Sequence, residues 1–320
     1  MRNFRCRIAL VLAGAFLSAT LTTGHAQVTR PNISPTVSPI HDVTVTARDG
    51  HDVIAVVREP PGDGPFPAVI AVHGGLWTMT REELRNLALD NPTMTRLLAN
   101  GYVTVIPTFR RRDEDPQTLT ALWDNLAIVD YVKQMESVDP SSVSIYGCSG
   151  GGDLVLEIAG ETTVAAVTSE EPATVLFTGM FDTGTPRQGE TYEGTDAFVL
   201  LEDPFAYYTP ELQAFTQGKI RKIDAPVFFV QGDQLLGRDP SVDHLRIQNE
   251  ILLREMDAAD KEWTRTVYPG QFHCFGFEGV SPMARDFFDD MDSFFKLHSP
   301  TQPVPIDASH VDYVQVEVPQ

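Results

Sequence analysis

The sequence predicts an α/β protein built on a mostly parallel sheet, and three observations support this. Short runs rich in β-branched residues alternate with longer stretches whose apolar residues recur at helical spacing. Arg48-Asp49-Gly50 lies between the first two runs, which is typical of an antiparallel hairpin. The chain has 320 residues, 42% of them hydrophobic, enough to bury the core of one full domain. The eight expected strands are residues 42–47, 53–58, 68–72, 103–106, 143–146, 164–168, 227–230 and 264–268.

The first 26 residues differ from the rest of the chain. Three arginines (Arg2, Arg5 and Arg7) precede an apolar run, and small and polar residues follow as far as Ala26. This order is typical of a signal peptide, so residues 1–26 are predicted to be removed on export to the periplasm or the exterior. A membrane anchor is the alternative, but the apolar run is shorter than the roughly 20 residues that span a bilayer.

The remaining chain divides into a leader (27–41), a catalytic domain (42–298) and a tail (299–320). Prolines in the tail predict loose order, although residues 311–318 could add a strand. Residues 171–224, after the sixth expected strand, are rich in Gly, Thr, Glu, Pro and aromatic residues. An insertion of this length predicts a lid over a binding site, with a surface excursion as the alternative.

The formal net charge of −20 argues against nucleic acid or an anionic membrane as a partner. We expect a small-molecule substrate, no metal, no cofactor and no membrane attachment after signal cleavage. The sequence does not indicate an oligomeric state.

A candidate nucleophile lies at the end of the fifth expected strand. The segment Gly147-Cys148-Ser149-Gly150-Gly151 is followed by a helical run, which places a G-x-S-x-G motif in a strand-turn-helix context. Cys148 is the alternative nucleophile, but a cysteine at the turn would need glycine two positions earlier, where Tyr146 stands. We therefore predict Ser149 as the nucleophile.

A serine hydroxyl needs a base, and the base needs an acid to orient it. His273 follows the last expected strand in a glycine-containing loop and is the predicted base. Asp233, just after the seventh strand, is the favoured acid; Asp239 and the pair Glu170-Glu171 are the alternatives.

Acyl transfer also needs donors for an oxyanion, usually two backbone N–H groups. Gly150, directly after the nucleophile, is one candidate. The second is Gly75 or Leu76 in the His-Gly-Gly-Leu-Trp loop after the third strand, and His73 is expected to brace this loop.

Together these residues resemble the α/β-hydrolase superfamily over about residues 42–297, which implies an eight-stranded, mostly parallel sheet flanked by helices. The loops around His73 and His273 are similar to those of dienelactone hydrolases, acetyl esterases and prolyl oligopeptidases. Cys148-Ser149, a later Asp and His273-Cys274 resemble the CS-D-HC pattern of tannases and feruloyl esterases. Tannases carry a larger lid, and glucuronoyl esterases, which share the cysteine pairing, have Arg where Gly150 stands here.

That resemblance implies a disulfide between Cys148 and Cys274. These are the two cysteines that remain after Cys6 leaves with the signal peptide, and each stands beside a predicted catalytic residue. If Ser149 and His273 meet, their neighbours could fall within bridging distance. Two separate buried thiols are the alternative.

The predicted function is that of an exported serine hydrolase that cleaves acyl or aryl esters through an acyl-enzyme. A peptidase of the prolyl-oligopeptidase type is the alternative. Such peptidases usually filter substrates with an N-terminal domain, for which few residues are available before the first strand.

Overall fold

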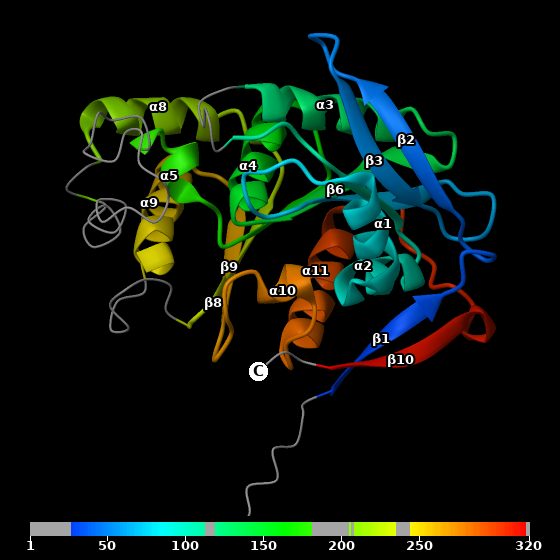
Figure 1. Ribbon diagram of the computed structural model, residues 1–320. Coiled ribbons are helices and arrows are strands. Elements are labelled where there is room, and N and C mark those ends of the chain that lie inside the picture. Colours follow the sequence, from blue (N-terminus) through cyan, green and yellow to red (C-terminus); the bar gives the residue numbers. More distant parts are fainter. Residues whose placement is uncertain (1–26, 113–118, 181–204, 206–207, 235–243, 318–320) are drawn as a thin grey trace, which may run out of the picture.

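The structure is a computed structural model that describes residues 27–112, 119–180, 205, 208–234 and 244–317. Its centre is an eight-stranded sheet in the order β2-β3-β5-β4-β6-β7-β8-β9 (Figure 1). Strand β3 is antiparallel to both of its neighbours, and the strands from β5 to β9 run parallel. The strands are β2 (Ile40–Thr46), β3 (Asp52–Arg58), β4 (Phe66–Val72), β5 (Val103–Pro107), β6 (Val138–Cys148), β7 (Val167–Glu170), β8 (Val227–Gly232) and β9 (Trp263–Tyr268).

All eight expected strands are present, and the predicted α/β class with a mostly parallel sheet is confirmed. The boundaries differ by a few residues. Strand β6 begins earlier than expected, at Val138, and β7 begins later, at Val167. Both end where the sequence places the motifs, so the carboxyl ends of the central strands carry the candidate site.

Helices cover both faces of the sheet and enclose two separate cores (Figure 1). Successive side chains of a strand point to opposite faces. In β4, Ile70 belongs to the core under α3 and α4, whereas Val69 and Ala71 belong to the core under α1, α2 and α11. The helices are α1 (Arg81–Asp90), α2 (Pro92–Ala99), α3 (Thr120–Lys133), α4 (Gly150–Glu161), α5 (Thr174–Phe177), α8 (Pro210–Ile220), α9 (His244–Ala258), α10 (Phe275–Glu278), α11 (Ala284–His298) and the 3-10 turn η2 (Ala308–His310).

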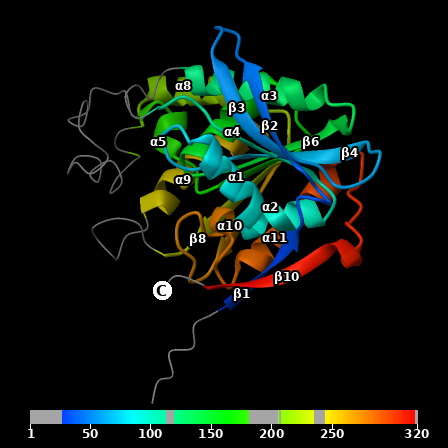
Figure 2. The same ribbon diagram turned by 45° about the vertical axis from the view of Figure 1, so that its right-hand side comes forward.

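The leader and the tail form a second sheet, in which β1 (Gln27–Ile33) pairs antiparallel with β10 (Val311–Glu317). Figure 2 shows this ribbon beside α2. The guanidinium of the buried Arg58 donates to backbone carbonyls, among them that of Ile33 at 2.7 Å. The leader is therefore an ordered part of the fold. Of the tail, β10 coincides with the optional strand that the sequence allows.

Three sequence predictions fall wholly or partly on residues that the structure does not describe: the signal peptide, Asp239 and residues 181–204 and 206–207 of the lid. The described parts of the predicted lid are residues 171–180, 205 and 208–224, which include α5 and α8. Within the described ranges, no helix has the length and apolar character needed to cross a bilayer.

Candidate active site

Ser149 occupies the turn between β6 and α4 and is half-buried. Its backbone has φ 52° and ψ −120°, a conformation that L-residues rarely adopt. Two glycines make this turn possible. A Cβ on Gly147 would collide with the carbonyl of Gly151, and a Cβ on Gly151 would collide with the carbonyls at the end of β4. The chain can therefore present a serine side chain here because the residues two positions before and after Ser149 are glycines.

Backbone strain is concentrated around this serine. Four non-glycine residues among those described have positive φ, and three of them are Ser149, Glu171 at 42° and Cys274 at 61°. The fourth, Asp260, lies in the turn between α9 and β9. Strained residues persist where the surrounding structure holds them, and they cluster at functional sites.

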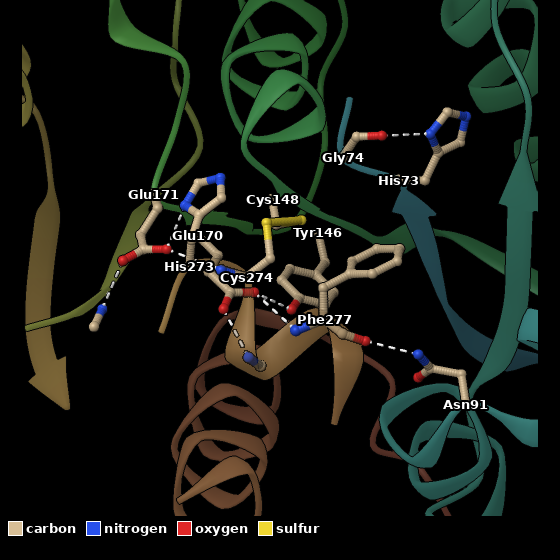
Figure 3. Close-up of a disulfide and its surroundings, with 12 residues drawn as sticks. His73, Gly74, Asn91, Tyr146, Cys148, Glu170, Glu171, His273, Cys274 and Phe277 are labelled. Atoms are coloured by element: carbon tan, nitrogen blue, oxygen red, sulfur yellow. Dashed lines mark hydrogen bonds and ion pairs between the residues drawn. A yellow bond between two sulfur atoms is a disulfide. The ribbon is translucent and has the colours of Figure 1, made fainter. Parts of the chain in front are cut away.

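The predicted disulfide between Cys148 and Cys274 is present, with a Cα–Cα distance of 5.6 Å (Figure 3). It joins the last residue of β6 to the residue that caps α10. A Cβ on Gly74 would lie 2.9 Å from the Sγ atom of Cys148, so the bridge also packs against the loop that follows β4. Ser149 and His273 each adjoin one half-cystine, and their backbones therefore lie close together.

The imidazole of His273 is oriented by Glu171, not by Asp233. Nδ1 of His273 donates to Oε2 of Glu171 at 2.7 Å, and the same oxygen accepts from the backbone N–H of Cys274 at 2.9 Å (Figure 3). The other oxygen, Oε1, accepts from the N–H of Gly232 at 2.9 Å. With three donors and 3% exposure, the carboxylate of Glu171 has little freedom to move.

Asp233 has a different partner. Its Oδ1 accepts from the backbone N–H of Gly270 in the loop before His273, and its side chain is exposed. Glu171 reaches His273 from the strand beside β8: Glu170 of β7 pairs with Val230 of β8, and the side chain of Glu171 accepts from the N–H of Gly232 at the end of β8. Adjacent strands are about 4.8 Å apart, and Glu is one methylene longer than Asp. In the sequence analysis, the Glu170-Glu171 pair is the third choice for the carboxylate that bonds to His273, after Asp233 and Asp239.

Opposing effects act on the pKa of His273. Burial lowers it, but the hydrogen bond and the charge of Glu171, together with the charges of Glu170 and Glu278, raise it above its usual value. The imidazolium form is thus stabilised by carboxylates on one side. A ring held in this way can accept a proton at Nε2 while Nδ1 stays bonded to Glu171.

The predicted oxyanion residues lie together on the other side of Ser149. Gly150 begins α4, and a Cβ added to it would lie against the carbonyl of Gly75 and 3.0 Å from the side chain of Leu76. The first N–H groups of a helix have no partner within it, so the start of α4 is suited to receive a negative charge. The structure brings the three predicted residues into one place.

Sequence reasoning missed the ion pair that braces this side. The backbone N–H of Arg112 donates to Leu76 O at 2.8 Å, and its Nη1 donates to Gly150 O at 3.1 Å. Its Nη2 lies 3.0 Å from Oδ2 of Asp153, with both side chains almost fully buried. Burial raises the pKa of Asp153, and the nearby Arg112 opposes this. The sequence feature that could have indicated this ion pair is the run of three arginines, 110–112, after β5.

His73 has a bracing position. Its ring is buried and stacks on Phe109 at 4.4 Å, and Nδ1 lies 2.8 Å from the carbonyl of Gly74. Burial lowers the pKa of His73 to about 4, so the ring is neutral near pH 7 and donates to that carbonyl. The ring thereby holds the loop of Gly74 and Gly75.

Comparison with solved structures concerns the fold that carries this site. The chain matches an esterase from Pyrobaculum calidifontis (TM-score 0.57, 19% identity, 81% of this chain and 85% of that one). It also matches carboxyl esterase 2 from the fungus Tuber melanosporum (TM-score 0.59, 17% identity, 84% and 90%). The chain has the α/β-hydrolase fold. At these identities the likeness concerns the fold alone.

Two sequence comparisons add to this. The profile of the family BD-FAE matches residues 56–186, which include the loop after β4, the nucleophile turn and Glu171. A curated relative, 2,6-dihydropseudooxynicotine hydrolase from Paenarthrobacter nicotinovorans, is 27% identical over 202 residues. That match spans 62% of this chain and about half (52%) of the relative.

Proposed function

We propose that the protein is a serine hydrolase that cleaves carboxylic esters, with Ser149 as nucleophile, His273 as general base and Glu171 as the acid. The observation that carries this proposal is the hydrogen bond from Nδ1 of His273 to Glu171. The disulfide joins Cys274, the residue after His273, to Cys148, the residue before Ser149. A serine nucleophile requires a base, and the base requires an acid that orients it. In this proposal the acid follows β7, whereas the residue favoured from the sequence, Asp233, follows β8.

The residues allow the following reaction. Oγ of Ser149 attacks the ester carbonyl while Nε2 of His273 takes its proton, and Glu171 stabilises the imidazolium that forms. The N–H of Gly150, with that of Gly75 or Leu76, donates to the oxyanion. Collapse of the intermediate releases the alcohol, which receives the proton from His273. Water then attacks the acyl-enzyme by the same route and releases the carboxylic acid.

Esters are favoured over peptides by the comparisons. The solved structures named above are esterases, and the curated relative is a hydrolase of another class of small molecule. A substrate panel follows from this: nitrophenyl esters of increasing chain length, methyl ferulate, 2,6-dihydropseudooxynicotine and an aminoacyl anilide. Turnover of the anilide in preference to every ester would favour the peptidase alternative.

The nucleophile is tested by Ser149→Ala. Because triad members act as a unit, we expect turnover of nitrophenyl acetate to fall by roughly four to six decades with the melting temperature retained. Near-normal turnover by the variant would falsify the proposal. A second measurement, mass spectrometry after a phosphonate ester inhibitor, should find the adduct on Ser149 and none on the variant.

We also propose that the mature protein is exported to the periplasm or beyond. The arginine-led apolar segment at residues 8–21 supports this, and so does the disulfide, since such bridges persist in oxidising compartments. Expression of the full chain followed by N-terminal sequencing of the product outside the cytoplasm tests it. A product that stays in the cytoplasm with Met1 in place contradicts it.

A further inference from the structure

Behind the proposed acid lies a second carboxylate that the reaction does not use. Glu170 is the last residue of β7 and is fully buried. Because it immediately precedes Glu171, its side chain leaves the strand in another direction. Figure 3 shows Glu171 at His273, and Glu170 directed towards Tyr146 and the start of α10.

Three donors converge on the Glu170 carboxylate. Oε2 accepts from the hydroxyl of Tyr146 at 2.5 Å and from the backbone N–H of Phe277 at 2.9 Å, and Oε1 accepts from the N–H of Gly276 at 2.7 Å. Tyr146 is also fully buried, and it lies in β6 three residues before Ser149. The carboxylate thus joins the strand of the nucleophile to the turn that follows His273.

That turn is held from its other side as well. Thr93 donates to the carbonyl of Gly276 at 2.6 Å, and Asn91 donates to the carbonyl of Phe277 at 2.7 Å. A Cβ on Gly276 would lie 2.6 Å from the ring of Phe287, so the turn is also in close contact with α11. Helix α10 is therefore held in one position. On the side that faces the sheet, the hydrogen bonds that hold it are those from the N–H groups of Gly276 and Phe277 to Glu170.

The charge of Glu170 acts on the same histidine. Burial raises its pKa to about 7 and the charge of Glu171 adds to this, while the bonds from Tyr146 and Gly276 and the charge of His273 oppose it. The charge of Glu170 also acts on Tyr146 and Tyr268 and contributes to the raised pKa of each hydroxyl. In return, ionised Glu170 favours the imidazolium form of His273.

We propose that Glu170 is a positioning residue for the site: through Tyr146, Gly276 and Phe277 it fixes the loop of His273 relative to the nucleophile turn. Its own backbone contributes to the same end, since the carbonyl of Glu170 accepts from the N–H of Ser149 at 2.9 Å. The catalytic consequence rests on the proposed function, whereas the placement of the imidazole does not.

The test is Glu170→Gln, which keeps the size of the side chain but sets an NH₂ group against donors. We expect kcat on nitrophenyl acetate to fall roughly 10- to 100-fold with KM within about twofold, because a small displacement of the base slows proton transfer without changing binding. The pKa of His273, followed by NMR in the full chain, should fall by roughly half a unit to one unit. The downfield Nδ1–H signal of the His273–Glu171 bond should broaden or disappear.

The matched control is Glu278→Gln. Glu278 is exposed and its charge also acts on His273, but its side chain makes none of the contacts that seat α10. We expect a smaller decrease in the pKa of His273, a sharp Nδ1–H signal and a plateau kcat within about twofold of the wild type. Equal losses of kcat in the two variants would show that Glu170 acts through its charge alone and would overturn positioning.

Tyr146→Phe gives a second route if Glu170→Gln does not fold. It removes one of the three donors and keeps the carboxylate, so we expect a loss of roughly two- to tenfold in kcat with KM unchanged. Full kcat and an unchanged Nδ1–H signal in this variant would overturn the proposal. If the wild type cleaves no ester, the proposed function fails, yet the Nδ1–H signal of Glu170→Gln still decides whether Glu170 positions His273.

Discussion

The two sides of Ser149 are held in place by different means. On the histidine side, Glu171, Glu170 and the disulfide fix the loop of His273, and the carboxylate that orients the ring also bonds to the backbone around it. On the oxyanion side, glycine contacts and a buried ion pair involving Arg112 fix the loop after β4. In the proposed mechanism the histidine side also takes part in proton transfer, whereas the oxyanion side only holds backbone N–H donors in place.

This difference affects what each side tolerates. An acid on the histidine side must keep its charge and its bond to the ring. A brace on the oxyanion side needs only to keep the backbone in place, so its loss lowers stability first and turnover second. The variants below separate these two kinds of dependence.

The largest effect is expected from Glu171→Gln. Loss of the acid that orients the imidazole should lower kcat by about four decades, as removal of a triad acid does elsewhere. Asp233→Asn should cost less than about tenfold, since the partner of Asp233 among the described residues is the backbone N–H of Gly270 and not His273. Steady-state rates on one nitrophenyl ester measure both. A larger loss for Asp233→Asn would return the acid to the strand that the sequence favours.

The next effect concerns the ion pair of the oxyanion side. Arg112→Met leaves Asp153 buried without its partner, which should lower the free energy of unfolding by about 3 to 5 kcal/mol. Urea denaturation at pH 7 measures this. Adding Asp153→Leu to the same chain should restore part of the loss, because the uncompensated charge is then gone. A loss below about 1 kcal/mol for the single variant would show that the pair is not a brace.

Removal of the bridge by Cys148→Ala with Cys274→Ala should come third. We expect a loss of about 2 to 4 kcal/mol in stability, with a fall in kcat larger than any change in KM, because the Ser149 and His273 loops are no longer tied. Thermal and urea unfolding give the first quantity and kinetics the second. Thiol titration of the unfolded, unreduced wild type should find no free thiol, and two would contradict the bridge.

The smallest effect is a displacement of the pH profile. As the proposed base, His273 must be neutral to accept a proton. Carboxylates raise the pKa of His273, so kcat/KM should fall as pH drops through a midpoint above the usual value for histidine. Glu278→Gln removes one negative charge and should move this acidic limb to lower pH by a few tenths of a unit. Asp153→Asn, on the oxyanion side, should leave the limb in place. Equal displacement in both would contradict the division between the two sides.

Local pattern accounts for what the sequence predicted of the site. The turn of Ser149 and the loop after β4 are signalled by glycines next to a strand, and the cysteines by their adjacency to Ser149 and His273. The acid is different. Whether Asp233 or Glu171 meets His273 depends on the pairing of β7 with β8 and on side-chain length, and neither has a local signal. The same register decides that Glu170 meets Tyr146.

The fold shows the same limit. The apolar runs predicted every strand of the main sheet, and the pattern is strongest in the central strands β5, β7 and β8, which are buried on both faces. The sheet of β1 and β10 was not predicted, since it joins the two ends of the described chain and depends on contacts such as that of Arg58 with Ile33. Neither segment alone carries much information about its pairing with a partner so distant in the sequence.

The bridge between Cys148 and Cys274 has a consequence for how the site assembles. Its two half-cystines are 126 residues apart, and the segment between them contains β7, β8 and β9. In an unfolded chain that keeps the bridge, Ser149 and His273 remain neighbours, so the longest-range contact among Ser149, Glu171 and His273 no longer has to be found by diffusion. The remaining search is for Glu171, which must come to a histidine that already lies beside its serine. If the disulfide forms before folding, the chain segment that must close to assemble the site becomes shorter. Contacts between residues that are closer along the chain form faster.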